Sequence, residues 1–263
     1  MTKVKIKNED EFMKHFKASI EEKNYIIGRN AVNEALKSGR VIDSLLVLQE
    51  ESSGSLKVIL AQAKEKGITI KKVNRKTLNS ISNGLFHQGI AAVVGAKAPC
   101  TVDDILNLAK SKNEPPFIII ADGIEDPHNL GAIIRTAECV GAHGVIIPKR
   151  RAVGLTNAVD KSSAGALEYV VVAKVGNIGA AIDDLKNKGL WIYGADINSE
   201  KWTAQDLKGP LALVIGSEGS GISKLVKEKC DFILSLPMFG KINSLNASVA
   251  AGILMYEVRR QRG

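Results

Sequence analysis

The sequence has little cysteine and no long apolar run. Its three cysteines, Cys100, Cys139 and Cys230, are widely spaced and odd in number. This argues against a disulfide framework and against a zinc site, and it favours reduced cysteines. No apolar run approaches the ~20 residues that cross a bilayer, and no apolar stretch follows the basic N-terminus as in a secretion signal. The sequence therefore predicts a cytoplasmic protein without membrane or metal partners.

Common phosphate-binding signatures are also missing. Residues 216–221 read GSEGSG, but no Gly-Lys-Ser/Thr follows at the distance that a Walker motif needs. Nor does a third glycine follow Gly219 and Gly221 as in a dinucleotide fingerprint. A glycine-rich turn with one acid still lets backbone approach a ligand closely, whereas a plain tight turn is an equal alternative.

Positive charge is present but unevenly distributed. The net charge is +8; residues 1–97 hold 17 Lys and Arg against 10 Asp and Glu, and residues 98–263 hold 19 against 18. A basic module beside a near-neutral one is typical of a polyanion-binding domain attached to a working domain. A lysine-rich solvated surface is the alternative.

The length of 263 residues fits two domains, and both have alternating helix and strand patterns. After a polar extension at 1–24, residues 25–97 predict a small three-layer α/β/α domain. Its expected helices are 28–38, 56–66 and 75–81, and its expected strands are 41–48, 68–73 and 90–94. We expect a linker at 98–114, although 102–109 can also form a helix.

Residues 115–263 predict a mainly parallel sheet covered by helices on both faces, because their strands are nearly continuous runs of Ile, Val and Leu. The expected strands are 117–124, 144–148, 169–173, 190–195, 211–215 and 232–236. The expected helices are 131–140, 156–167, 178–188, 222–229 and 245–260. Ligands of such sheets bind at the carboxyl ends of the strands.

Three polar loops follow strands of this second domain. They read DGIEDPHNLG at 122–131, GSEGSG at 216–221 and PMFGKINSLN at 237–246. Arg135 lies four residues after Gly131, which places it on the helix face nearest the first loop. Alone, each loop is weak evidence for a site.

Together the three segments resemble a known family. DPxNLGxxxRTAExxG, VIGSEGSGI and LPMxGxxxSLNxSVAAGIxxYExxRQ are similar, in order and spacing, to the three motifs of the SpoU (TrmH) family of the SPOUT methyltransferase superfamily. GRNAV at 28–32 and HQGI at 87–90 resemble the small RNA-binding domain that precedes the catalytic domain in the rRNA-modifying branch. The resemblance covers about residues 25–262.

The resemblance implies a SPOUT catalytic domain with a deep C-terminal trefoil knot, a rare exception to unknotted chains, and a homodimer. It implies that S-adenosyl-L-methionine binds through backbone groups near Gly216, Leu236 and Leu245. Met238 and the segment from Leu213 to Ser217 would line the adenine and ribose pocket, which suits a ring that prefers apolar walls.

The implied activity is methylation of a ribose 2′-hydroxyl in structured RNA, here a guanosine of 23S ribosomal RNA. The resemblance gives Arg135 the central catalytic role, with Asn129, Glu218, Ser244 and Asn246 supporting it. Arginine keeps its proton in proteins, since its pKa is above ~12. We therefore expect the guanidinium to hold the target phosphate and polarise the hydroxyl, while a phosphate oxygen or water takes the proton.

Structural roles remain open for the same residues. Asn129, Ser244 and Asn246 can cap helices, Glu218 can be a solvated turn residue, and Arg135 can pair with Glu138. Lys149-Arg150-Arg151 is either a phosphate-binding patch or a solvated loop.

Other activities also remain open. The alternatives are a transfer-RNA ribose methyltransferase, a drug-resistance methyltransferase that acts on an rRNA adenosine, and a catalytically silent RNA-binding protein. Intact motif residues weigh against the silent protein, and the added basic domain favours rRNA over tRNA.

Overall fold

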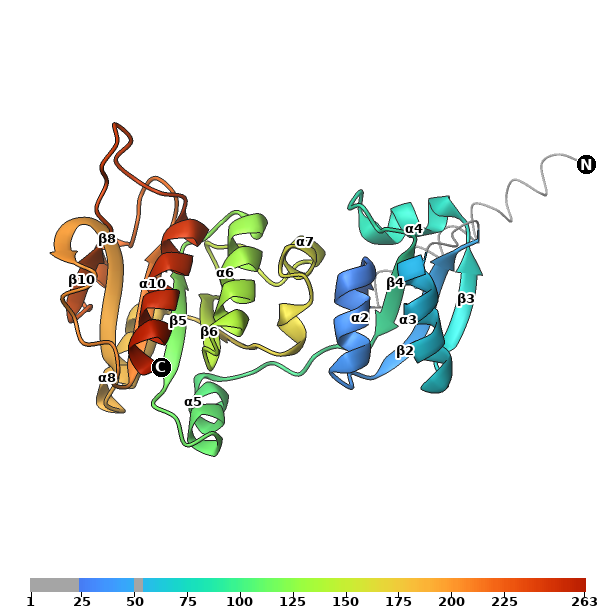
Figure 1. Ribbon diagram of the computed structural model, residues 1–263, viewed down its shortest axis with the longest axis horizontal. Coiled ribbons are helices and arrows are strands. Elements are labelled where there is room, and N and C mark those ends of the chain that lie inside the picture. The colour runs from blue at the N-terminus through green and yellow to red at the C-terminus, as the bar shows by residue number, and fades with distance from the viewer. Residues whose placement is uncertain (1–23, 50–53) are drawn as a thin grey trace, which may run out of the picture. The chain divides into compact units, whose positions relative to one another are not determined.

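The computed structural model describes residues 24–49 and 54–263 (Figure 1). The chain divides into an N-terminal unit, Met1–Ala98, and a C-terminal unit, Pro99–Gly263. The expected extension at 1–24 lies outside the described residues except for Asn24. Helix α5 (Val102–Ser111) starts with a capping box from Thr101, and its Ile105 is fully buried in the C-terminal core. The stretch expected as a linker thus carries the helix that we gave as its alternative, and from Pro99 onwards it belongs to the C-terminal unit.

The N-terminal unit is a four-stranded sheet between two helical layers. The strand order is β1-β4-β2-β3, with β2 parallel to β3 and antiparallel to β4. Two helices cover one face and α4 covers the other, each with its own apolar cluster. The elements are β1 (Asn24–Ile27), α2 (Arg29–Lys37), β2 (Ile42–Leu48), α3 (Gly54–Glu65), β3 (Thr69–Val73), α4 (Arg75–Ser82) and β4 (Ile90–Val94).

Strand β1 was not predicted. Its four residues are too few for a periodic pattern, and the strand exists because it pairs antiparallel with β4, from Asn24 opposite Val94 to Ile27 opposite Ala91. The other elements of this unit occur where we predicted them, within one or two residues. The three-layer α/β/α prediction is confirmed.

The C-terminal unit contains a six-stranded sheet in which every neighbouring pair is parallel. Its order is β10-β8-β9-β5-β6-β7. The strands are β5 (Phe117–Asp122), β6 (Gly144–Pro148), β7 (Val171–Val175), β8 (Trp191–Lys201), β9 (Leu211–Gly216) and β10 (Phe232–Ser235). The central strands β5, β6 and β9 are buried along almost their whole length, as their apolar runs predicted.

Helices cover both faces of this sheet, each over a separate apolar core. One face carries α6 (Pro127–Cys139), α7 (Asn157–Ser162), the short 3-10 helix η1 (Ala166–Glu168) and α10 (Ala247–Arg262). The other carries α5, α8 (Ile178–Asn187) and α9 (Lys224–Lys227). The parallel, doubly covered sheet that we predicted is confirmed.

Several predicted boundaries were wrong. The single helix expected at 156–167 is divided into α7 and η1, because Ala164 and Gly165 take φ values of 54° and 95°. In place of the helix expected at 222–229, the structure has the four-residue helix α9. Strand β8 continues six residues beyond the expected end at Ala195. The last helix begins at Ala247 rather than Leu245, because Asn246 caps it.

The chain reverses its winding direction at the centre of the sheet. The connection after β5 leads to β6 on one side, and the connection after β9, the neighbour of β5, leads to β10 on the other. The loops at the carboxyl ends of β5 and β9 therefore diverge, and such a switch point is where ligands of open parallel sheets bind. Among the described residues, no helix is long and apolar enough to span a bilayer.

Candidate active site

The loops after β5 and β9 are tied together at the switch point. The Ser223 amide donates to Asp122 Oδ2 at 2.8 Å, which joins the end of the glycine-rich loop to the last residue of β5. Ser217 and Gly221 exchange two backbone hydrogen bonds of 3.0 Å and close that loop. A Cβ at Gly216 would collide with the backbone of Gly221 and Ile222, so only glycine fits there.

Three side chains from three separate segments of the chain meet above this point. Asn129 Nδ2 donates to Glu218 Oε1 at 2.8 Å. Asn246 Nδ2 donates to Asn129 Oδ1 at 3.0 Å and also contacts Glu218 Oε1. The Asn129–Glu218–Asn246 cluster thus joins the start of α6, the loop after β9 and the start of α10.

The local sequence explains why Asn129 is available for this cluster. Asp126, not Asn129, caps α6 by accepting from the His128 amide at 3.0 Å, and Pro127 takes the first helical position. Asn129 therefore lies inside the first turn, only 5% exposed, and points its amide at Glu218.

Asn246 serves both as a helix cap and as a member of the cluster. Its Oδ1 accepts from the Ser248 and Val249 amides at 2.9 and 3.2 Å and so begins α10. Its Nδ2 group is left to hold Asn129 and Glu218. The structural and functional alternatives for this residue are therefore compatible, because they use different atoms.

Glu218 keeps one carboxylate oxygen available. Oε1 receives both amide groups, whereas Oε2 accepts no hydrogen bond from any residue that the structure describes. The side chain is exposed and lines the neighbouring pocket. A carboxylate oriented in this way can accept a hydrogen bond from a ligand hydroxyl.

A pocket of about 500 Å³ opens beside the cluster. It lies among the carboxyl ends of β8, β9 and β10 and the start of α10. Seven predicted site residues line it: Ser217, Glu218, Leu236, Met238, Ser244, Leu245 and Asn246. The pocket therefore combines apolar walls with a few polar groups, as cofactor sites do.

Two predicted cofactor residues do not line the pocket. Leu213 is 1% exposed and belongs to the apolar core under α10. Gly216 ends β9 and packs against the backbone of the loop that follows it. Both support the pocket from behind.

Arg135 lies apart from the pocket. It is exposed on α6, six residues beyond Asn129, and it is absent from the pocket wall. Among the described residues it has no hydrogen-bond or ion-pair partner, and the pair with Glu138 is not formed. Its guanidinium is therefore available to a ligand or a second chain.

Sequence reasoning missed some pocket residues, namely Asp196, Ile197 and Asn243. Asp196 and Ile197 lie in β8 directly after Ala195, the last residue that pairs with β9, and β8 has no glycine-rich loop. The signal was nevertheless present, since β8 is parallel to β9 and its carboxyl end lies at the same edge. Asp196 is fixed by an ion pair of 2.6 Å with Lys227.

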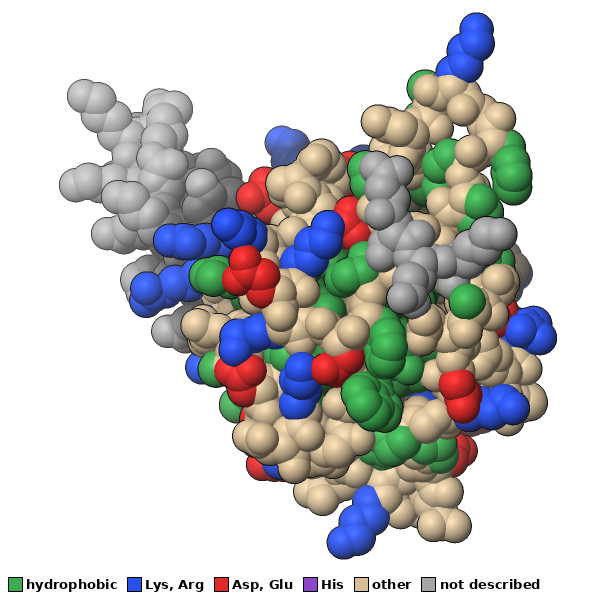
Figure 2. Space-filling view, turned by 90° about the vertical axis from the view of Figure 1, so that its left-hand side faces the viewer, with side chains coloured by type: hydrophobic (Ala, Val, Ile, Leu, Met, Phe, Trp, Pro, Cys, Tyr) green, Lys and Arg blue, Asp and Glu red, His purple; other side chains and the backbone are tan. Residues whose placement is uncertain are grey.

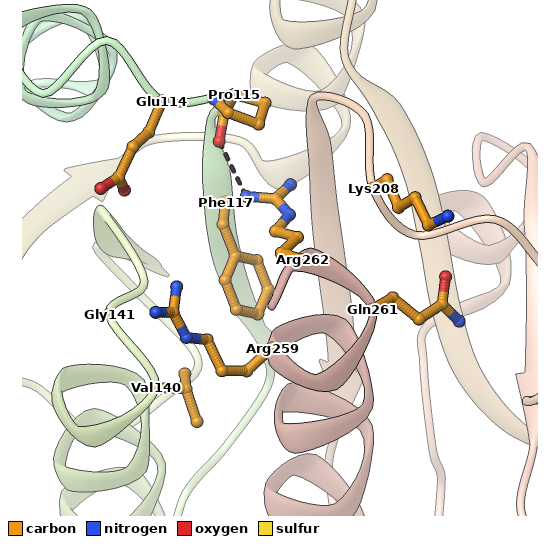
Figure 3. A pocket seen from close by; sticks show the side chains of 9 residues that line it. All are labelled: Glu114, Pro115, Phe117, Val140, Gly141, Lys208, Arg259, Gln261 and Arg262. Atoms are coloured by element: carbon orange, nitrogen blue, oxygen red, sulfur yellow. Dashed lines mark hydrogen bonds between the residues drawn. The ribbon is translucent and has the colours of Figure 1, made fainter.

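A second pocket, of about 320 Å³, lies near the amino ends of the strands, next to the start of β5 (Figure 3). Arg262 donates there to the carbonyls of Pro115 at 2.8 Å and Gly209 at 2.6 Å, and it lies 5.2 Å from the Phe117 ring centre. These contacts anchor the end of α10 to the sheet.

Among residues 24–49 and 54–263, no group of three or more His, Cys, Asp or Glu could hold a metal ion.

The comparisons with known proteins cover nearly the whole chain. Residues 116–256 match the SpoU rRNA Methylase family. Residues 25–100 match the domain described as RNA 2'-O ribose methyltransferase substrate binding. A relative from Bacillus subtilis (strain 168), named a TrmH family tRNA/rRNA methyltransferase, YacO, is 51% identical over 91% of this chain and 96% of its own.

Solved structures agree with the sequence relatives. The SpoU methyltransferase AviRb from Streptomyces viridochromogenes, in complex with AdoMet, has a TM-score of 0.76 and 26% identity over 92% of this chain and 91% of its own. The A. aeolicus TrmH/SpoU tRNA modifying enzyme has a TM-score of 0.52 and 30% identity over 61% of this chain and 83% of its own. Matched along both units by family, relatives and fold, the chain belongs to the SpoU (TrmH) family of RNA methyltransferases.

Proposed function

We propose that this protein transfers a methyl group from S-adenosyl-L-methionine to a ribose 2′-hydroxyl of ribosomal RNA in the cytoplasm, at a guanosine of 23S rRNA. The observation that carries the proposal is the Asn129–Glu218–Asn246 cluster at the mouth of the 500 Å³ pocket, at the switch point of the sheet.

The pocket fits the cofactor. Its volume lies in the range of small-molecule sites, and Leu236, Met238 and Leu245 give the apolar walls that an adenine ring prefers. Ser217, Ser244 and nearby backbone supply polar groups. When bound, the cofactor supplies an activated methyl group, so the protein has mainly to align the hydroxyl and help remove its proton.

We assign two tasks to the residues around the hydroxyl. Glu218 Oε2, oriented by two amides on Oε1, accepts a hydrogen bond from the ribose hydroxyl. Arg135 binds the target phosphate with its guanidinium, and the hydroxyl proton passes through Glu218 Oε2 to a phosphate oxygen or water. Asn129 and Asn246 hold Glu218 in place.

We also propose a homodimer formed through α10. Val249, Ile253 and Tyr256 are 49%, 37% and 56% exposed, and Gly252 lies between them. An apolar helix face with a small residue is suited to close packing against a second copy. On the side towards α6, a Cβ at Gly252 would lie 3.9 Å from Thr136 Cγ2, so α6 and α10 are neighbours there. The trefoil knot implied by the family remains a prediction.

Two observations favour rRNA over tRNA. The N-terminal unit carries nearly all the net positive charge and matches a substrate-binding domain. The tRNA modifying enzyme from A. aeolicus, by contrast, matches only 61% of this chain. We assign the basic unit to binding folded rRNA.

The test is to map 2′-O-methylated nucleotides in total RNA from a deletion strain and its parent. We expect one methylated guanosine to disappear from 23S rRNA and to return when the gene is restored. Loss of a tRNA site would favour the tRNA alternative, and loss of an rRNA adenosine site would favour the drug-resistance alternative. An unchanged methylation map would favour the silent RNA-binding protein.

A further inference from the structure

The loop after β6 presents three adjacent cations. Lys149, Arg150 and Arg151 are all exposed, and the sequence has no acidic residue between Glu138 and Asp160. Arg151 has a φ of 59°, a left-handed conformation that is uncommon for a residue with a side chain. The C-terminal unit is otherwise almost neutral, so this loop is a local concentration of positive charge.

Several lysines elsewhere in the unit have acidic partners. On the face that carries α8 and β10, positive and negative side chains lie next to one another (Figure 2). Lys186 pairs with Asp231 and Lys229 with Asp183, both at 2.6 Å, and Lys188 pairs with Asp184 at 2.7 Å. In the described part of the chain, no carboxylate pairs with Lys149, Arg150 or Arg151. The face with α8 and β10 thus has several of its charges paired, whereas the three adjacent cations of this loop have no acidic partner among the described residues.

The loop also lies at the edge of the sheet that carries the candidate active site. Since β6 pairs with β5 and β5 with β9, the carboxyl end of β6 is two strands from that of β9. With ~4.8 Å between neighbouring strands, the start of the loop is about 10 Å from the strand that leads to Glu218. A short stretch of single-stranded RNA spans such a distance.

Backbone contacts hold the loop against the start of α6. The Lys149 amide donates to Val175 O at 2.8 Å, and the Val153 amide donates to Ile124 O at 2.9 Å, just before the turn that leads to Asn129. Downstream, Ser162 Oγ of α7 lies 2.9 Å from Pro127 O, and a Cβ at Gly131 would collide with that serine. The backbone on both sides of the three cations is therefore held close to the first turn of α6, which carries Asn129.

We propose that Lys149, Arg150 and Arg151 bind phosphates of the RNA strand next to the methylated nucleotide and so position its ribose at Glu218. This inference rests on the proposed function. Guanidinium groups bind phosphate with paired hydrogen bonds, and unpaired cations lose little on binding it. The cofactor pocket is on the other side of the cluster, towards β8 and β10, so these cations serve the RNA and not the cofactor.

The experiment compares three full-length variants with the parent. Arg150→Gln/Arg151→Gln removes two charges from the loop, and Arg150→Lys/Arg151→Lys keeps them. Lys208→Gln/Arg259→Gln is the matched control, because both residues are exposed at the opposite edge of the sheet and, among the described residues, unpaired (Figure 3). Each protein is titrated with an unmodified 23S rRNA transcript at several salt concentrations, and its affinity for S-adenosyl-L-methionine is measured by calorimetry.

For the loop glutamine variant we expect weaker RNA binding and a salt slope smaller by about 1.4, since each lost contact with a single strand removes about 0.7. Its cofactor affinity should equal that of the parent, and the lysine variant and the control should keep the parental slope. A parental slope in the loop glutamine variant, or an equal loss in the control, would overturn the proposal. Because binding is measured independently of methyl transfer, failure of the proposed activity would be seen separately, as no methyl transfer by the parent protein.

Discussion

Asn246 and Asn129, 117 residues apart in the chain, are joined by a hydrogen bond of 3.0 Å from Asn246 Nδ2 to Asn129 Oδ1. The bond places the first turn of α6 beside the start of α10 and leaves Glu218 between the two amides. Asn246 therefore has two tasks. Its Oδ1 caps α10, and its Nδ2 orients the Glu218 carboxylate.

Asn246→Asp should therefore separate stability from activity. Aspartate caps helices as well as asparagine does, so the free energy of unfolding should change little, whereas Asn246→Ala should lose about 0.5–2 kcal/mol. Aspartate cannot donate to Asn129 and adds a negative charge beside Glu218, so methyl transfer should fall at least about 100-fold. Urea unfolding and a tritiated-methyl assay measure the two effects. Near-parental turnover of the aspartate variant would mean that the cluster does not serve catalysis.

Arg135→Ala should abolish methyl transfer and leave cofactor affinity nearly intact. The side chain is exposed, unpaired among the described residues and outside the pocket wall, so its removal should change the free energy of unfolding by about 0.5 kcal/mol or less. Calorimetry with S-adenosyl-L-methionine and single-turnover methylation provide the measurements. Glu138→Ala, an exposed change on the same helix, is the control. Normal turnover in Arg135→Ala would remove this residue from the mechanism.

Ile253→Glu should convert a dimer into a monomer. Ile253 lies in the exposed apolar face of α10, so a carboxylate there would be buried without a partner in a dimer but solvated in a monomer. Sedimentation equilibrium of the full chain decides the outcome, with Val58→Glu, an exposed apolar position in the N-terminal unit, as the control. A parent protein that sediments as a monomer would show that this face does not form a dimer interface.

Stability should fall in mild acid because of His143. The imidazole is 1% exposed, accepts from the Phe117 amide at Nδ1 and contacts Glu114 at 3.1 Å. Burial lowers the pKa of His143, and this effect outweighs the attraction of Glu114. The unfolded chain then binds the proton more tightly than the folded one. The stabilisation from this group is complete above about pH 6.5 and decreases as the pH falls below that value.

Urea unfolding between about pH 7 and 5 tests this prediction. His143→Asn keeps an acceptor for the Phe117 amide but does not titrate there, so its free energy of unfolding should depend less on pH than that of the parent. His128→Asn, at an exposed histidine, should keep the parental dependence. Equal pH dependence in all three proteins would show that His143 does not govern stability in this range.

Local sequence patterns were enough to predict the two α/β units, the parallel sheet and the three loops of the candidate site. These features depend on local patterns: buried strands are continuous apolar runs, and turns need particular residues such as Gly216, where no Cβ fits. The motif spacing also indicated the family, since it is a property of the chain and not of its folding.

Which of these residues meet depends on how the strands and helices pack together. Strand β1 forms because it pairs with β4. Ile105 belongs to the C-terminal unit because its side chain is buried in the apolar core of that unit. The order of the strands brought β9 next to β5 and so joined Glu218 to Asn129, while it left Arg135 on an outer face of α6. Contacts between segments about 100 residues apart depend on packing of the whole sheet, and local sequence does not encode that arrangement.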